Sequence, residues 1–304
     1  MLENYRIQVF RAVAEQTSFR RAAEQLHISQ PSVSQHVQLL EEELGTRLLD
    51  RTSTGVRLTQ AGELLLNYAR RSSRMSQQLL AEITQQEGQA AGNLHLAAST
   101  TVAQYLLPRM LAGFRQENPR IALTVRSGNT QQVTDWLLAS EIDLGLIEGP
   151  PASKEVKVEP FLDDRLILIV PHKDPWAKAR TISLDQLKQA SFLLREPGSG
   201  TRRVMEQALR RAGLRINQLT IAMELDSTGA IVSAVEAGLG VGIVSELAIQ
   251  KELHLATVAA ISVPGLVMKR AFSLIRKRGP VEAGPAAAFR QFALSLSSNL
   301  PGKI

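Results

Sequence analysis

The chain has 304 residues, of which 44% are hydrophobic and 21% are charged, enough apolar sequence for two or three folded units. It contains no cysteine and no apolar run of about eighteen residues, which argues against disulfides, thiolate metal sites and membrane-spanning helices. The first residues lack signal-peptide features, so we expect a cytoplasmic protein without a membrane partner and without a cofactor.

The net charge is +6, but it is unevenly distributed. Residues 1–90 hold ten arginines against ten acidic residues, so residues 91–304 carry the whole excess. The overall charge is therefore weak evidence for a nucleic-acid partner, and any such prediction has to rest on local patterns.

The first sixty residues predict a helix-turn-helix. Apolar residues repeat at helical spacing over residues 5–14, and residues 19–26 form a second, short helix. Ser29 is placed to cap a third helix over residues 30–44, and Gly45 is placed to end it. Two short helices, a tight turn and a longer third helix are typical of this DNA-binding motif.

The third helix has an apolar and a polar face. Val33, Val37, Leu40 and Leu44 form a stripe that we expect to be buried. Alone, the uncharged opposite face fits an ordinary solvated surface. In this motif its amides and hydroxyls can instead hydrogen bond base edges in the major groove. The predicted DNA contacts on this segment are Ser29, Gln30, Pro31, Ser32, Ser34, Gln35 and Gln38.

A β-hairpin wing is predicted around the turn at Thr54 and Gly55. Arg51 and Arg57 at its edges are predicted to contact phosphate or reach the minor groove. A long helix over residues 60–87 then carries an apolar stripe, which fits packing on its own domain as well as pairing with a second copy. Small residues over 88–92 predict a hinge after this helix.

These first residues resemble the LysR-type transcriptional regulators. The agreement lies in SFRRAAEQLHISQPSVS at residues 18–34, LLEEELGTRLLDR at residues 39–51 and TQAG at residues 59–62. One departure is Leu49, where the family usually has Phe. The resemblance implies a winged helix-turn-helix over residues 1–59, a dimerisation helix over residues 60–90 and an effector-binding domain over residues 91–304.

From residue 93 onward, short apolar strands alternate with helices, which predicts an α/β fold with parallel strands. The resemblance implies two lobes, similar to a periplasmic binding protein, with a cleft between them. Lobe I would comprise residues 91–164 and 267–304, and lobe II residues 165–266. The chain would cross near residues 162–166 and return near residues 265–270.

Hydroxyl-rich turns precede four of the predicted helices. Each turn alone is an ordinary helix cap, but several helix N-termini that converge on one cleft form an anion site, to which arginines add charge-assisted bonds. We therefore predict a small anionic effector. The predicted effector-binding residues are Ser99, Thr100, Thr101, Ser127, Asn129, Glu148, Arg195, Gly198, Ser199, Thr201, Arg202 and Thr228.

The sequences IEGP at residues 147–150 and GSGTR at residues 198–202 are similar to one branch of the family. That branch responds to inorganic sulfur oxyanions or to carbon-fixation metabolites. Sulfite or sulfate is thus the first candidate effector, and a phosphorylated or carboxylate metabolite is the second.

Two other functions fit an anion-binding module. An enzyme using Ser99 or Ser199 would lack a Gly-x-Ser-x-Gly turn and a histidine placed to activate either serine. A solute-binding protein would need export and would leave residues 1–60 without a role.

We therefore expect a non-enzymatic regulator that binds double-stranded promoter or operator DNA with an imperfect dyad. The resemblance implies a homodimer that assembles into a homotetramer, with RNA polymerase as a further candidate partner. The operator, the target genes and the direction of regulation stay open.

Overall fold

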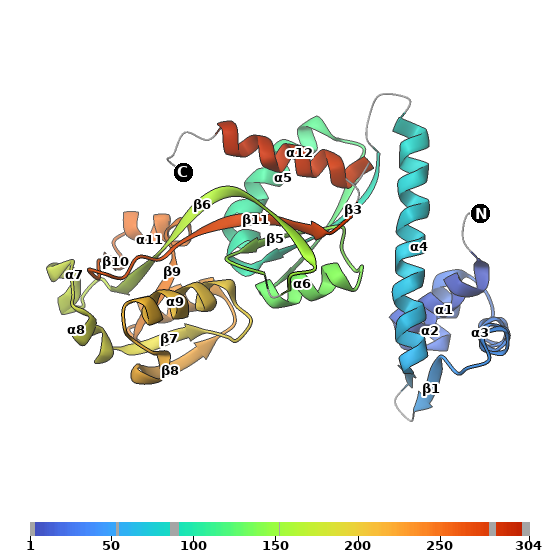
Figure 1. The fold of residues 1–304 in the computed structure, drawn as a ribbon, viewed down its shortest axis with the longest axis horizontal. Coiled ribbons are helices and arrows are strands. Elements are labelled where there is room, and N and C mark those ends of the chain that lie inside the picture. Colours follow the sequence, from blue (N-terminus) through green and yellow to red (C-terminus); the bar gives the residue numbers. More distant parts are fainter. Residues whose placement is uncertain (1–3, 53–54, 86–90, 152, 280–283, 300–304) are drawn as a thin grey trace. The chain divides into compact units, whose positions relative to one another are not determined.

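The computed structural model describes residues 4–52, 55–85, 91–151, 153–279 and 284–299. The chain divides into two units, Met1–Gln89 and Ala90–Ile304, each with its own core (Figure 1). Within the described ranges, no helix combines the length and the apolar character needed to cross a bilayer.

Unit 1 contains the three predicted helices: α1 (Tyr5–Gln16), α2 (Phe19–Leu26) and α3 (Gln30–Leu44). The hydroxyl of Ser18 accepts a hydrogen bond from the backbone N–H of Arg21 at 3.3 Å, and Ser29 accepts one from Ser32 at 3.3 Å. Gly45 ends α3 in the left-handed conformation, with φ of 65°. The predicted caps are therefore confirmed.

The core of unit 1 forms where α1, α2 and α3 meet. Phe10, Val33 and Val37 lie inside it, as the periodicity predicted. The prediction was wrong for Leu44, whose side chain is 48% exposed. The chain turns back after α3, and Leu48, 1% exposed, joins the core cluster in its place.

The wing and the long helix follow. Strands β1 (Leu49–Thr52) and β2 (Gly55–Leu58) pair antiparallel, which confirms the hairpin, although Thr54 in its predicted turn lies outside the described residues. Helix α4 (Gln60–Gln85) begins where predicted. The hydroxyl of Thr59 accepts a hydrogen bond from the N–H of Gly62 at 3.1 Å. Residues 86–90, which include most of the predicted hinge, lie outside the described residues.

Unit 2 is an α/β structure with strands in the order β4-β3-β5-β11-β6-β9-β7-β8, and β10 pairs with β6 (Figure 1). Its strands are β3 (Gly92–Ser99), β4 (Ile121–Gly128), β5 (Leu144–Glu148), β6 (Val156–Pro171), β7 (Ser191–Arg195), β8 (Thr220–Leu225), β9 (Val241–Ser245), β10 (Val258–Ile261) and β11 (Lys269–Lys277). Its helices are η1 (Val102–Leu106), α5 (Leu107–Glu117), α6 (Thr130–Leu138), α7 (Pro175–Ala179), α8 (Leu184–Lys188), α9 (Gly200–Arg211), η2 (Ile216–Gln218), α10 (Thr228–Glu236), η3 (Glu246–Ile249), α11 (Gln250–His254) and α12 (Gly284–Asn299).

Strand β6 is shared between two halves of unit 2. Residues Val156–Arg165 pair with β11, whereas Leu166–Ile169 pair with β9. We call the half built on β4, β3, β5, β11 and the start of β6 lobe I, and the half built on the end of β6, β9, β7, β8 and β10 lobe II. The backbone N–H of Leu166 also bonds the carbonyl of Met268 at 2.8 Å, so the two connections between the lobes lie side by side (Figure 1).

The predicted helix after β3 begins differently from expectation. Residues Val102–Leu106 form a single turn of π-helix before α5. Pro108, near the start of α5, has no N–H to donate to a preceding carbonyl, so the regular α-helical ladder cannot run through this point. Such turns recur at functional sites, and this one directly follows the hydroxyl-rich residues at the end of β3.

Candidate functional site

The polar side of α3 is accessible within unit 1. Its predicted DNA contacts are exposed or half-buried: Ser29, Gln30, Pro31, Gln35 and Gln38 are exposed, and Ser32 and Ser34 are half-buried. Directly beneath, Val33 and Val37 are buried in the core. The helix is therefore anchored by one side and free to contact a groove with the other.

Two glutamates that follow this face have bonding roles. Glu41 accepts the backbone N–H groups of Leu48 at 2.6 Å and Leu49 at 3.1 Å, and so fixes the first strand of the wing to α3. Glu42 accepts a hydrogen bond from the amide of Gln38 at 2.9 Å. On the wing, Arg57 is exposed, whereas the side chain of Arg51 lies outside the described residues.

A second polar site lies between the lobes of unit 2 and centres on Glu148. This residue ends β5, and its side chain is buried, with the whole residue 1% exposed. Its carboxylate accepts hydrogen bonds from Ser99, from Thr101 at 3.1 Å and, more weakly, from Thr201 at 3.5 Å. Ser99 and Thr101 belong to lobe I, and Thr201 lies in the first turn of α9 in lobe II. One carboxylate thus joins the lobes.

Burial raises the pKa of Glu148, because removal from water penalises the charged form. The positive charges of Arg270 and Arg195 and the hydrogen bond from Thr101 oppose this effect, and the negative charge of Asp164 adds to it. Burial is the largest of these influences, so protonation of Glu148 is easier than for an exposed glutamate.

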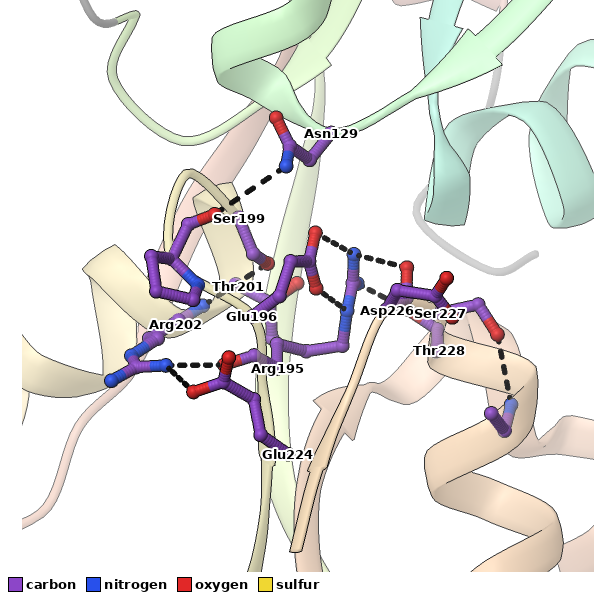
Figure 2. A network of polar contacts seen from close by, with 12 residues as sticks. Asn129, Arg195, Glu196, Ser199, Thr201, Arg202, Glu224, Asp226, Ser227 and Thr228 are labelled. Atoms are coloured by element: carbon purple, nitrogen blue, oxygen red, sulfur yellow. Dashed lines mark hydrogen bonds and ion pairs between the residues drawn. The ribbon is translucent and has the colours of Figure 1, made fainter.

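Hydroxyl groups extend this site into lobe II. Thr101 and Thr228, the first residue of α10, lie 2.9 Å apart through their hydroxyl oxygens. The guanidinium of Arg195 donates to Thr228 at 3.0 Å and to both carboxylate oxygens of Glu196 (Figure 2). It also donates to the carbonyl of Asp226 at 3.2 Å. Arg195 is therefore a buried support for Thr228, and its own charge is already paired.

A third arginine, which the sequence did not single out, completes the site. Arg270 on β11 donates to Asp164 at 2.6 Å and to Thr201 at 2.8 Å. Its remaining terminal nitrogen, Nη2, is buried and has no hydrogen-bond partner among the described residues, and the same holds for the hydroxyl of Thr100. Asp164 lies on β6, and both strands carry several charged residues, so no local sequence pattern singled out the pair of Arg270 and Asp164.

The lobes also meet at a second pair of loops. The amide of Asn129 donates to the carbonyl of Pro197 at 3.4 Å (Figure 2). The backbone N–H of Gln131 donates to the carbonyl of Gly198 at 3.2 Å. Gly198 has φ of 91°, and a Cβ there would lie 3.1 Å from the Asn129 amide. This close approach needs glycine.

Packing between β5 and α9 is tighter still. A Cβ on Gly200 would lie 1.9 Å from the carbonyl oxygen of Glu148, so only glycine fits at this helix start. Ser199 beside it caps α9 by accepting the N–H of Arg202 at 3.4 Å. The glycines of the GSGTR sequence therefore allow the two lobes to come into close contact.

The structure gathers most of the predicted effector residues but not all of them. Ser99, Thr101, Glu148, Arg195, Thr201 and Thr228 form one bonded network, and Thr100 adjoins it. Asn129, Gly198 and Ser199 form the neighbouring contact. Ser127 lies exposed on β4 outside both. Arg202 binds Glu224 at 2.6 Å (Figure 2) and Glu206 at 3.0 Å instead, and these two carboxylates neutralise its charge.

Comparison with known families covers both units. Residues 5–63 match the family model described as a bacterial regulatory helix-turn-helix protein of the lysR family. Residues 87–297 match the model described as the LysR substrate binding domain.

Two curated relatives align with most of this chain. The RuBisCO operon transcriptional regulator of Allochromatium vinosum is 35% identical over 294 residues, which is 97% of this chain and 96% of that protein. The HTH-type transcriptional regulator CysL of Bacillus subtilis is 34% identical over 269 residues, covering 88% of this chain and 89% of that one.

Two solved structures show the same architecture. The regulatory domain of CcmR from Synechocystis, in complex with 2-PG, is 26% identical with a TM-score of 0.63, covering 69% of this chain and 100% of that chain. Full-length CbnR in complex with its target DNA is 24% identical with a TM-score of 0.68, covering 97% of this chain and 99% of that chain. The second likeness bears on the fold alone.

Replacing Glu148 with Gln is expected to change how stability depends on pH. Because its folded-state pKa is raised, Glu148 contributes most favourably below its ordinary value of 4.5, and this contribution is lost as pH rises through the higher folded pKa. Gln keeps the shape without ionising, so thermal unfolding at pH 5 to 8 should show Glu148→Gln gaining stability relative to wild type as pH rises.

The exposed Glu155 provides the matched control, and Glu155→Gln should show a difference from wild type that stays constant over this range. If the Glu148→Gln difference were equally constant, the raised pKa would be refuted.

Proposed function

Because this chain belongs to the LysR family of bacterial DNA-binding transcriptional regulators, we propose that a small anion bound between its two lobes controls its activity. The chain is a regulator with an effector-binding domain, and its relatives are regulators, not enzymes. In keeping with this, the hydroxyl of Ser99 is committed to Glu148 and that of Ser199 to a helix cap. The proposal rests on the polar network at Glu148.

Three helix starts meet in this network. Thr101 lies at the helical turn before η1, Thr201 in the first turn of α9, and Thr228 at the start of α10. Helix N-termini offer free N–H groups and a partial positive charge, so their meeting point favours an anion. In the present structure the carboxylate of Glu148 takes that position.

Two buried donors are left over at the same place. In the part of the chain that the structure describes, the hydroxyl of Thr100 and the Nη2 group of Arg270 have no partner, although buried polar groups are almost always paired. The oxygens of a small anion would supply both with acceptors. We therefore assign the effector site to Thr100, Thr101, Thr201, Thr228 and Arg270, with Ser99, Glu148 and Arg195 holding the site together.

The class of anion stays within the two predicted alternatives. Sulfite or sulfate would fit a site built from hydroxyls and N–H groups. The CcmR regulatory domain in complex with 2-PG supports the other alternative, a small phosphorylated or carboxylate metabolite. In either case Glu148 opposes a second negative charge when ionised, so binding should strengthen as pH falls and Glu148 becomes protonated.

Thermal unfolding of the full chain against sulfate, sulfite, phosphate, 2-PG and small carboxylates tests this proposal. A ligand at a hundred times its Kd should stabilise the wild type by about 2.7 kcal/mol. Thr101→Val should lose this gain, whereas Ser127→Ala, outside the network, should retain it. Stabilisation by neutral or cationic compounds only, or an undiminished gain in Thr101→Val, would overturn the assignment.

The DNA-facing residues give a second prediction. Gln35 presents its amide from the exposed face of α3, so Gln35→Ala should reduce discrimination between operator and unrelated DNA by about 1–3 kcal/mol for each lost bidentate contact. Arg57→Ala on the wing should weaken binding to all sequences alike and flatten the salt dependence. Fluorescence anisotropy at several salt concentrations measures both effects, and wild-type behaviour in both variants would refute this DNA-binding surface.

Helix α4 carries an apolar stripe that unit 1 leaves uncovered. Leu64 is 68% exposed, Tyr68 51%, Met75 70% and Leu79 44%, and their spacing places them on one side of the helix. Leu66 and Ala69 occupy the other side and are buried. The stripe suits a second copy of the same helix, so we propose a homodimer through α4, and a homotetramer of such dimers on an imperfectly dyadic operator.

A charge placed in the stripe should separate the copies. Leu64→Glu combined with Met75→Glu is expected to lower the oligomeric mass measured by light scattering at least two-fold, because two carboxylates would have to be buried. Glu63→Lys is the control, since Glu63 is exposed on the same helix about 100° from Leu64. An unchanged mass in the double variant would exclude α4 as the dimer contact.

The proposed division of labour follows the predicted boundaries. Residues 1–59 read DNA, residues 60–90 pair the copies, and residues 91–304 sense the effector, with lobe I over residues 91–164 and 267–304 and lobe II over residues 165–266. We place the protein in the cytoplasm, where its operator lies, and treat RNA polymerase as a candidate partner at the promoter.

A further inference from the structure

Unit 2 contains a cavity of about 470 Å³, and of the residues assigned to the effector site only Arg270 borders it. It is lined by residues from both lobes: Gly149, Pro150 and Pro151 after β5, Val158 on β6, one side of α9, and the segment from Gly265 into β11. Its volume is in the range of small-molecule pockets. None of the predicted effector residues lines it.

The cavity lies on the other face of β11 from the Glu148 network. Lys269, Ala271 and Ser273 line it, and alternate residues of a strand share one face. Arg270 borders the cavity, but its guanidinium is bound to Asp164 and Thr201 on the opposite face. The two sites therefore lie on opposite faces of β11.

The charges that line this cavity are all positive. Arg211 on α9 and Lys269 on β11 are exposed, and neither forms an ion pair within the described residues. Among the residues that the structure describes, no acidic residue lines the cavity. Two acids pair with lining residues in the strand ladder: Asp164 opposite Arg270, to which it is bound, and the exposed Asp163 opposite Ala271. The lining thus favours an anionic group near Arg211 and Lys269.

The remaining walls are largely apolar. Val204 and Ala208 face the cavity from α9, Val158 from β6, and Val267 and Met268 from the segment before β11. Such walls gain by covering an aliphatic or aromatic group, whereas a bare inorganic ion would leave them in water. The occupant that fits both features has one anionic end and an apolar body.

We propose that this cavity is a second ligand site, which binds a small organic anion with an apolar segment, such as a monocarboxylate of about six carbons. This proposal does not depend on the anion site at Glu148. A ligand here would touch α9 of lobe II and β11 of lobe I together, so it would act on the placement of the lobes from the side opposite to the Glu148 network.

Methionine methyl groups provide a direct probe of the cavity. The chain has six methionines, of which Met268 lines the cavity, while Met110 and Met205 lie in the cores of lobes I and II. Hexanoate should shift the Met268 methyl signal of the full chain, labelled with ¹³C at its methionine methyl groups, in a saturable manner, and the affinity should fall as salt is raised. Hexan-1-ol, which lacks the charge, should bind at least about five-fold more weakly.

Variants of the two cationic lining residues test whether their charges bind the carboxylate of hexanoate. Arg211→Ala and Lys269→Ala should each weaken hexanoate binding by about three- to ten-fold, and the double variant should abolish the saturable shift. Arg210→Ala is the matched control, because Arg210 binds Glu206 and does not line the cavity. Unchanged Met110 and Met205 signals would show that each variant is folded.

Three results would overturn the proposal. They are equal binding of hexan-1-ol and hexanoate, an unweakened double variant, and displacement of hexanoate by saturating inorganic sulfate. The last would place hexanoate in a site for simple anions. Failure of the Glu148 site would leave the Met268 result unaffected, so the two proposals fail separately.

Discussion

The buried carboxylate of Glu148 is the contact on which the sensing half depends. It accepts hydroxyl groups from lobe I at Ser99 and Thr101 and from lobe II at Thr201, at the point where three helices begin. A buried charge is tolerated only when such partners surround it. Any change at Glu148, whether a proton or a competing anion, therefore alters contacts in both lobes at once. Since β6 runs without a break from lobe I into lobe II, we expect such a change to move one lobe against the other.

The DNA-reading half could be predicted almost completely, because its signals are local. Ser18 and Ser29 cap the helices that follow them, and Gly45 ends α3 in the left-handed conformation, which glycine adopts more readily than other residues. The apolar spacing of Val33 and Val37 fixed which side of α3 is buried. The burial of Leu44 was predicted wrongly because the exposure of the last helical residue depends on where the chain turns next. Here Leu48 returns to the core.

The sensing half could be predicted in outline only. Its strands are largely apolar and most of its helices are capped, so the alternation of strands and helices could be recognised in the sequence. Strands β9 and β10 were missed, and the pairing of Arg270 with Asp164 joins residues far apart in the sequence, which no local pattern reveals. For the same reason Arg202 was assigned to the effector, although Glu206 and Glu224 already neutralise it. The hydroxyl-rich turns were good guides, because Thr101, Thr201 and Thr228 do converge.

Control of DNA binding by an anion requires that the two halves be linked energetically. Linkage is reciprocal, so the factor by which the anion changes operator affinity must equal the factor by which operator DNA changes anion affinity. Calorimetric titration of the full chain with its most stabilising anion, with and without saturating operator DNA, measures this factor directly. We predict a difference of about 5- to 150-fold between the two titrations. Identical anion affinities in the presence and absence of operator DNA would contradict effector control of this regulator.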